Sequence, residues 1–110
     1  VVPLMAFRRS TDPTQADYTV ASGSATNIAI PDAAKAVSIH VTNGETIYVV
    51  AKDADNTGDC SSSNKDWTLD STIPLMQFGL NGLNRDANDF PTHVSLIASS
   101  TSATVVVRFF

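Results

Sequence analysis

The stretch AVSIHVTNGETIYVV, residues 36–50, constrains the fold more than any other part of the chain. Apolar residues alternate with polar ones over 37–42, Asn43-Gly44 follows, and a second apolar run occupies 47–50. A period of two is typical of a strand with one buried face. Asn-Gly accepts the positive φ values of a type I′ turn. These residues therefore predict a β-hairpin whose two strands pair with each other.

The same pattern continues through the rest of the chain. The C-terminus predicts a last hairpin, in which HVSLIAS and the closing strand ATVVVRFF flank a serine-rich turn. Further strands are expected in DYTVA (17–21), ATNIAIP (25–31) and TIPLMQFGL (72–80). Good helix formers are scarce, whereas Val, Thr, Ser, Ile and Asn are common. With about seven or eight short strands, we expect an all-β chain folded as an antiparallel, jelly-roll-like β-sandwich.

Length and charge narrow the function classes. The chain has 110 residues, enough for one domain, and we expect an N-terminal arm or edge strand over 1–10 and a single sandwich over 11–110. Its net charge of −4 argues against nucleic acid as a partner, since phosphate contacts need a basic face. No apolar run approaches the roughly 20 residues of a membrane span. Cys60 is the only cysteine, which fits synthesis in a reducing cytoplasm.

The most polar stretch is DADNTGDCSSSNKDW, residues 53–67. It begins like an EF-hand loop, but Thr57 replaces an acidic ligand and Asn64 stands where a bidentate glutamate is expected. The sequence therefore predicts no metal site. An irregular calcium site would have to use Asp53, Asp55 and Asp59. We expect instead a long exposed connection, with a contact loop as the alternative interpretation. In either case Cys60 is expected to be an incidental exposed thiol.

Catalytic signatures are not found in the sequence. It has no G-x-S-x-G elbow, no H-E-x-x-H and no glycine-rich phosphate loop. His40 and His93 are the only histidines, and two histidines need carboxylates to complete a zinc site. Trp67, the single tryptophan, is expected to fill the core at a loop end and not to form a sugar-binding platform. We therefore expect no enzymatic activity and no cofactor.

Two segments carry a resemblance to a known class of proteins. Residues 25–53 have the pattern of a short strand, a small-residue bend and a hairpin, and residues 92–110 that of a terminal hairpin. In this pattern the chain resembles small all-β virion proteins of tailed bacteriophages, of the capsid cement or decoration type. The resemblance implies a structural protein of the virion, often a homotrimer, that stabilises the head by bridging major capsid subunits.

Contacts with such a partner are expected at two places. The N-terminal segment offers Leu4, Phe7, Arg8 and Arg9, and arginine pairs bidentately with carboxylates. The segment 81–91 offers Arg85 and Phe90, and such residues are enriched in interface anchors. The alternative function is a receptor- or glycan-binding β-sandwich module of a phage tail or another surface assembly.

Overall fold

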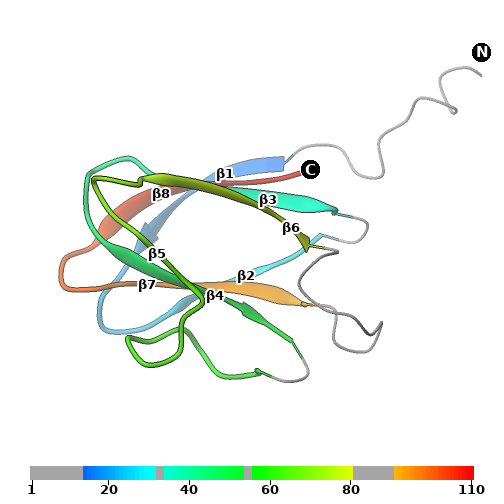
Figure 1. Cartoon of the computed structure of the whole chain (residues 1–110), viewed down its shortest axis with the longest axis horizontal. Helices are drawn as coiled ribbons and strands as arrows, with labels where there is room; N and C mark the ends of the chain where they lie inside the picture. Colours follow the sequence, from blue (N-terminus) through cyan, green and yellow to red (C-terminus); the bar gives the residue numbers. More distant parts are fainter. Residues whose placement is uncertain (1–13, 32–33, 54–55, 81–90) are drawn as a thin grey trace, which may run out of the picture.

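The computed structural model describes residues 14–31, 34–53, 56–80 and 91–110. They form eight antiparallel strands in two four-stranded sheets that face each other (Figure 1). This confirms the predicted all-β sandwich. The strands are β1 Thr14–Val20, β2 Thr26–Ala29, β3 Ala36–Val41, β4 Ile47–Lys52, β5 Trp67–Leu69, β6 Leu75–Gly79, β7 His93–Ala98 and β8 Ala103–Phe109.

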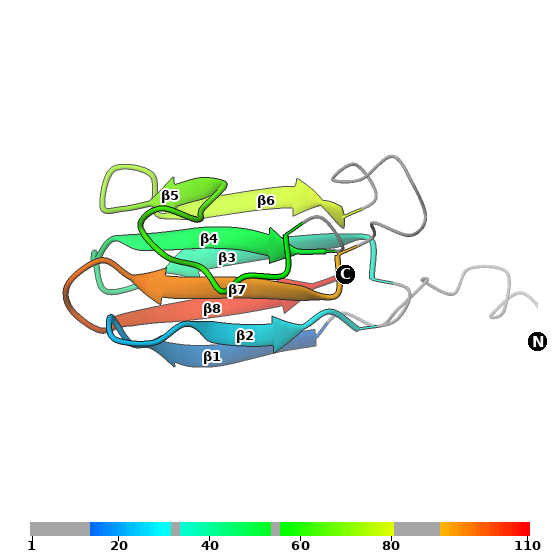
Figure 2. The ribbon, with the colours of Figure 1, turned by 90° about the horizontal axis from the view of Figure 1, so that it is seen from below.

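The strand order identifies the sandwich as a jelly roll. The first sheet has the order β1-β8-β3-β6, and the second has the order β2-β7-β4-β5. Each strand is followed by a strand of the opposite sheet, except that β4 is followed by its own neighbour β5. Two interlocked Greek keys of this kind define the double-sheet jelly roll. As Figure 2 shows, β1 and β2 lie along one side of the sandwich and β5 and β6 along the other.

The predicted hairpin over 36–50 is wrong. Its two strands form where expected, but β3 pairs with β6 and β8, whereas β4 pairs with β5 and β7. Asn43-Gly44 does make a turn, in which Gly44 has a φ of 76°. That turn carries the chain from one sheet to the other. Alternation and turn chemistry are the same in a hairpin and in a crossover, so the local signal could not separate them.

The predicted C-terminal hairpin is wrong for the same reason. Strand β7 belongs to the second sheet and β8 to the first, so the serine-rich turn between them is also a crossover. The two crossovers support each other, because the Asn43 Nδ2 donates to the Ser102 carbonyl at 3.2 Å. The Thr42 N–H also donates to the Thr104 carbonyl at 2.8 Å. Long-range pairing thus replaces the local pairing that the sequence predicted.

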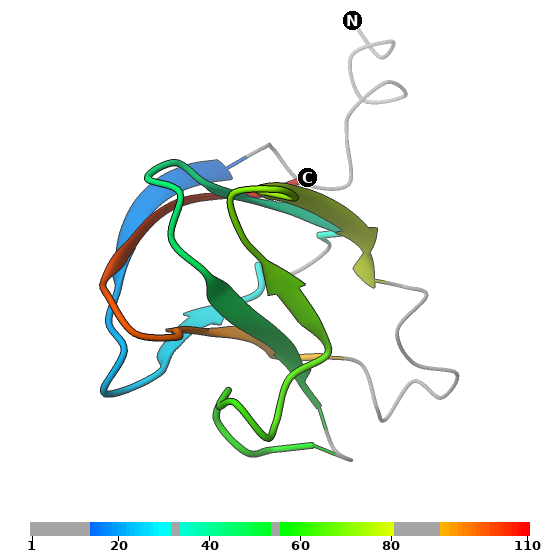
Figure 3. The ribbon, with the colours of Figure 1, turned by 60° about the vertical axis from the view of Figure 1, so that its left-hand side comes forward.

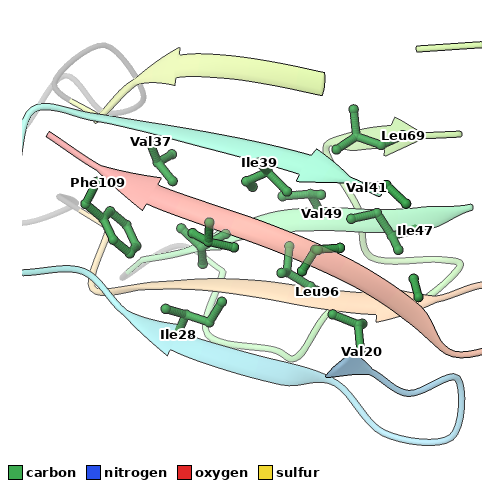
Figure 4. Close-up of a cluster of buried hydrophobic side chains, with 14 of the residues drawn as sticks. Val20, Ile28, Val37, Ile39, Val41, Ile47, Val49, Leu69, Leu96 and Phe109 are labelled. Atoms are coloured by element: carbon green, nitrogen blue, oxygen red, sulfur yellow. The ribbon is translucent and has the colours of Figure 1, made fainter. Parts of the chain in front are cut away.

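The core lies between the sheets and is made of the alternate residues that point inward (Figure 4). In β3 the buried residues are Val37, Ile39 and Val41, as the alternation predicts. Full burial of a valine, leucine or isoleucine side chain contributes about 1.5–3 kcal/mol. The other large core side chains with less than 2% exposure are Val20, Ile47, Val49, Leu69, Leu80, Val94, Leu96, Val105 and Val107.

An aromatic pair closes the core on the side of β5 and β6. Trp67 begins β5 and Phe78 lies in β6, and their rings stack with centroids 4.4 Å apart. Both side chains pack against the core, as expected for Trp67. The sequence did not predict β5, which is only three residues long. No helix in the described ranges is long and apolar enough to cross a membrane.

Candidate interaction surfaces

The connection between β4 and β5 covers the outer face of the second sheet. We call its residues 56–66 the covering loop, and Figure 3 shows it on the side of that sheet that faces away from the core. The Cys60 N–H donates to Ser95 Oγ at 2.9 Å, and Ser95 is fully buried. Val50 lies opposite Ser95 across the strand pair and is also fully buried. The expectation of an exposed connection is therefore wrong at the centre of the loop.

Cys60 itself is buried, with 2% of its surface exposed, so the predicted exposed thiol is wrong as well. Burial raises the pKa of the Cys60 thiol to about 11. The group is therefore a protonated thiol at neutral pH, and a protonated thiol is a poor nucleophile and metal ligand. Its place above the second sheet gives it a packing role. Nothing in the sequence indicated this burial, because Asp59 before Cys60 and Ser61 to Ser63 after it are all polar.

A second anchor of the covering loop is the carboxylate of Asp59. Its Oδ1 accepts from Lys52 Nζ at 2.8 Å and from Asn27 Nδ2 at 3.1 Å. The hydrogen bond from Lys52, followed by that from Asn27 and the lysine charge, lowers the pKa of Asp59. The anchor joins the loop to β4 and β2. Because Asp59 is exposed, solvent screens the ion pair and each contact is weak.

Asn64 holds the covering loop together from within. Its Nδ2 lies 3.0 Å from the Asp59 carbonyl and 3.3 Å from the Gly58 carbonyl. The Asn56 Nδ2 donates in turn to Asn64 Oδ1 at 2.9 Å. Short amide and hydroxyl side chains are suited to such turns because they replace backbone partners. The polar sequence of this stretch thus encodes a self-bonded loop.

Of the three calcium candidates, Asp53 and Asp59 each bond to other groups of the chain and lie within the described residues. Asp55 lies outside them, and Asp53 Oδ1 accepts the N–H of Asn56 at 2.9 Å. Asp59 already neutralises the ammonium group of Lys52. No group of three or more histidine, cysteine, aspartate or glutamate side chains that could hold a metal occurs within the described ranges.

The two histidines lie on opposite outer faces of the sandwich. His40 alternates with the buried Ile39 and Val41 in β3, so it points away from the core on the first sheet. His93 precedes the buried Val94 in β7 and points outward from the second sheet. The core separates them, so they cannot share a metal ion or a catalytic centre. His93 Nδ1 lies 2.9 Å from Thr92 Oγ1.

The outer face of the first sheet, in contrast, is open in the described part of the chain. One row of side chains crosses it from Asp17 through Val106 and His40 to Leu75. Leu75 is 55% exposed and Ile73, just before β6, is 61% exposed. They are the exposed large apolar residues of the described ranges. Exposed apolar groups that lie together are typical of interaction sites.

A small cleft lies on the opposite side, between β1 and β2. Its volume is about 190 Å³. Most of its lining is apolar, with Gln15 and the half-buried Tyr18 as polar groups. Ligand pockets for small molecules usually enclose about 300–1,000 Å³. The cleft is below that range.

The predicted partner contacts lie outside the described residues. They are Leu4, Phe7, Arg8, Arg9, Arg85 and Phe90. Sequence reasoning missed Ile73 and Leu75. A signal was available in the sequence, because TIPLMQFGL has no charged residue. In the structure, Leu75 is one of the alternate residues of β6 that point away from the core.

Several solved structures are similar to this chain, among them the following two. No protein-family model matches the chain, and no curated protein sequence is significantly similar to it. The SPBc2 prophage-derived protein YomS is 13% identical, with a TM-score of 0.49 over 90% of this chain and 95% of that one. A chain of Bacillus endospore appendages, a family of disulfide-linked pili, is 16% identical, with a TM-score of 0.45 over 89% and 84%. Both TM-scores are below 0.5, so the fold assignment depends on the strand order itself.

Proposed function

We propose that this chain is a non-catalytic structural protein that works by burying its surface against other subunits of a virion or surface assembly. In its specific form, it is a capsid cement or decoration protein that stabilises a phage head by bridging major capsid subunits. The observation that carries the proposal is the edge strand β6, which has no charged residue, begins with the exposed Leu75 and is preceded by the exposed Ile73. Such an edge favours a protein partner.

The fold is compatible with this role without specifying it. Jelly rolls occur in viral capsid proteins and in lectins, and a fold alone does not determine a function. The choice between a capsid protein and a lectin therefore depends on the side chains at the surface. In the described ranges, polar groups of the covering loop bond to one another and to the second sheet. These groups are therefore already used and are not available to bind a ligand.

The alternative, a glycan-binding module, receives less support from the geometry. Sugar sites use exposed aromatic rings, but the Trp67 ring stacks on Phe78 and packs against the core. The cleft between β1 and β2 is small, at about 190 Å³. A contact surface is therefore the better interpretation.

The contacts that the sequence predicts complete the proposal. Leu4, Phe7, Arg8 and Arg9 would bind a neighbouring subunit, and Arg85 and Phe90 would form a second contact. Apolar and arginine side chains together make suitable anchors against a capsid surface that presents carboxylates.

A direct test is to locate the chain in the organism that encodes it. The gene is epitope-tagged, released particles and appendages are banded on a density gradient, and each band is quantified by immunoblotting. We expect the chain in the particle band at a fixed ratio to the major capsid protein, and heads without it should release DNA at lower temperature. A chain found only among unassembled proteins would contradict the proposal. If the chain cofractionates with appendages, the structural role is supported and the capsid role is contradicted.

A further inference from the structure

We propose that β6 is a self-association edge: it binds β6 of a second copy in antiparallel orientation, about a two-fold axis at Gln77. The first sheets of the two copies then form one continuous sheet. This inference goes beyond the proposed function, although both start from the exposed edge strand β6; its tests measure pairing between copies, whereas the test of that function measures where the chain is found. It is argued from the edge strands, the orientation of their backbone groups and the side chains that would meet.

The edge strands of the sandwich differ in how well they are protected. Strands β2 and β5 are short, with four and three residues. Strand β1 has seven residues and carries Asp17 at its centre. Strand β6 has five residues, LMQFG, and no charge. Proteins commonly protect sheet edges by short strands or by charges, so β6 is the unprotected edge among those described.

The backbone of β6 presents free groups on its outer side. The Pro74 carbonyl accepts the Val41 N–H at 2.8 Å, and the Leu80 N–H donates to the Lys35 carbonyl at 2.8 Å. Even-numbered residues therefore point their backbone groups toward β3, and in a strand the odd-numbered ones point the other way. Within the described ranges β6 pairs with β3 alone. The N–H and C=O groups of Leu75, Gln77 and Gly79 thus face the open edge.

A second copy of β6 matches this edge. With Gln77 opposite Gln77 of the second copy, Leu75 lies opposite Gly79 and exchanges backbone hydrogen bonds with it. Glycine leaves room for the exposed leucine on the outer face. On the inner side the half-buried Met76 lies opposite the half-buried Phe78, and thioether sulfur packs well against an aromatic ring. The pairing covers apolar surface on both faces of the edge.

The other long edge of the first sheet cannot do the same. An antiparallel two-fold pairing of β1 about its centre would place Asp17 opposite Asp17 of the second copy. Like charges directly opposite each other destabilise a strand pair. In β6 the residue on the axis is glutamine, whose amide both donates and accepts a hydrogen bond. The edge is therefore self-complementary in shape, charge and hydrogen bonding.

The consequence for the molecule is a symmetric dimer, in place of the trimer that the resemblance implied. A two-fold dimer carries each remaining surface twice. One kind of contact site would then suffice to bridge two neighbouring subunits of an assembly.

The first test is the native mass, measured by light scattering over a range of concentrations. We expect twice the 11.7 kDa of one chain at high concentration and a monomer on dilution. Gln77→Lys places two ammonium groups on the axis and should raise the dimer dissociation constant about fivefold or more. Gln15→Lys is the matched control: it makes the same substitution at an exposed position of β1 and should leave the constant within about twofold.

The second test is a cross-link in the native fold. Paired residues of this hydrogen-bonded type have Cα atoms about 5.5 Å apart, a distance that a disulfide spans. Gln77→Cys should therefore oxidise to a covalent dimer, whereas Asp17→Cys on β1 should not. The unmodified protein measures any background from Cys60, which is buried.

Three results would overturn the proposal. They are a monomer at every concentration, an oligomer that Gln77→Lys leaves unchanged, and a Gln77→Cys protein that forms no covalent dimer. The thermal melt of each variant separates a failure to fold from a failure to pair. None of these results bears on whether the chain is found in particles, so the two proposals fail independently.

Discussion

The outer faces of the two sheets follow the same alternating pattern but have different environments. On the second sheet Ser95 and Val50 point away from the core and are nevertheless fully buried, because the covering loop lies over them. On the first sheet His40 and Leu75 also point away from the core, and both are exposed. Alternation in the sequence thus predicts which side chains point away from the core. Whether they then meet solvent depends on what lies over the sheet.

The difference also assigns roles to the two faces. The second sheet has already bound a segment of its own chain, through Ser95 and the Lys52–Asp59 pair. The first sheet has an open face and an unprotected edge at β6 within the described ranges. Partners are therefore expected on the first sheet. The following variants test this comparison, beginning with the largest expected effect.

Val107→Asp should abolish or nearly abolish folding. Val107 is 1% exposed in β8, and a buried carboxylate without a partner is among the most costly changes, at more than about 4 kcal/mol. Val106→Asp is the control on the open face; its carboxylate would lie opposite Asp17 on one side and His40 on the other, and it should cost about 1 kcal/mol. Urea denaturation measures both. An unchanged stability of Val107→Asp would place β8 outside the core, and an equal loss in both variants would mean that the outer face of the first sheet is covered.

Ser95→Ala should destabilise the protein by about 1–3 kcal/mol, since it removes the acceptor of the buried Cys60 N–H. Ser38→Ala makes the same change on the outer face of the first sheet, where we expect less than about 0.5 kcal/mol. Chemical denaturation of the two variants gives the difference. Equal effects would show that the covering loop does not protect the second sheet.

Asn64→Ala should loosen the covering loop without unfolding the domain. Asn64 bonds to the Asp59 and Gly58 carbonyls, so its loss should speed the labelling of Cys60 by a disulfide reagent about tenfold, for about 1.4 kcal/mol of loop stability. In the unmodified protein the rate should rise with pH toward about 11, the pKa of the buried thiol. Thr104→Cys with Cys60→Ala reports an exposed thiol for comparison. Rapid labelling of unmodified Cys60 would contradict its burial.

The smallest effect is expected from Asp59→Asn. Lys52 and Asn27 lower the pKa of Asp59 below its ordinary value of 3.8, so the folded state binds this proton less tightly than the unfolded state. The contribution of the pair is therefore present above pH 3.8 and is lost as the pH falls through the lower, folded value. Urea midpoints measured across this acidic window should fall less steeply in the variant. If the urea midpoints of the two proteins change with pH in parallel, the Lys52–Asp59 pair does not contribute to stability.

Much of the local structure could be predicted from the residues. The strands near 36–41, 47–52, 93–98 and 103–109 were all expected, and the alternation in β3 correctly selected Val37, Ile39 and Val41 for the core. The pairing of these strands could not be predicted. A turn such as Asn43-Gly44 fits both a hairpin and a crossover between sheets, and the choice is made by β6, β7 and β8, which are far away in the sequence.

For the interaction surfaces, too, some features follow from the sequence and others only from the tertiary structure. The sequence by itself determined an all-β domain, seven of its eight strands and the inward side of β3, because these follow from side-chain alternation and turn residues within a few positions. Only the tertiary structure decided that Cys60 is buried, that Ser95 is covered and that Leu75 lies at an open edge. Each of these depends on which segments meet across the sandwich, and that is set by packing over the whole chain.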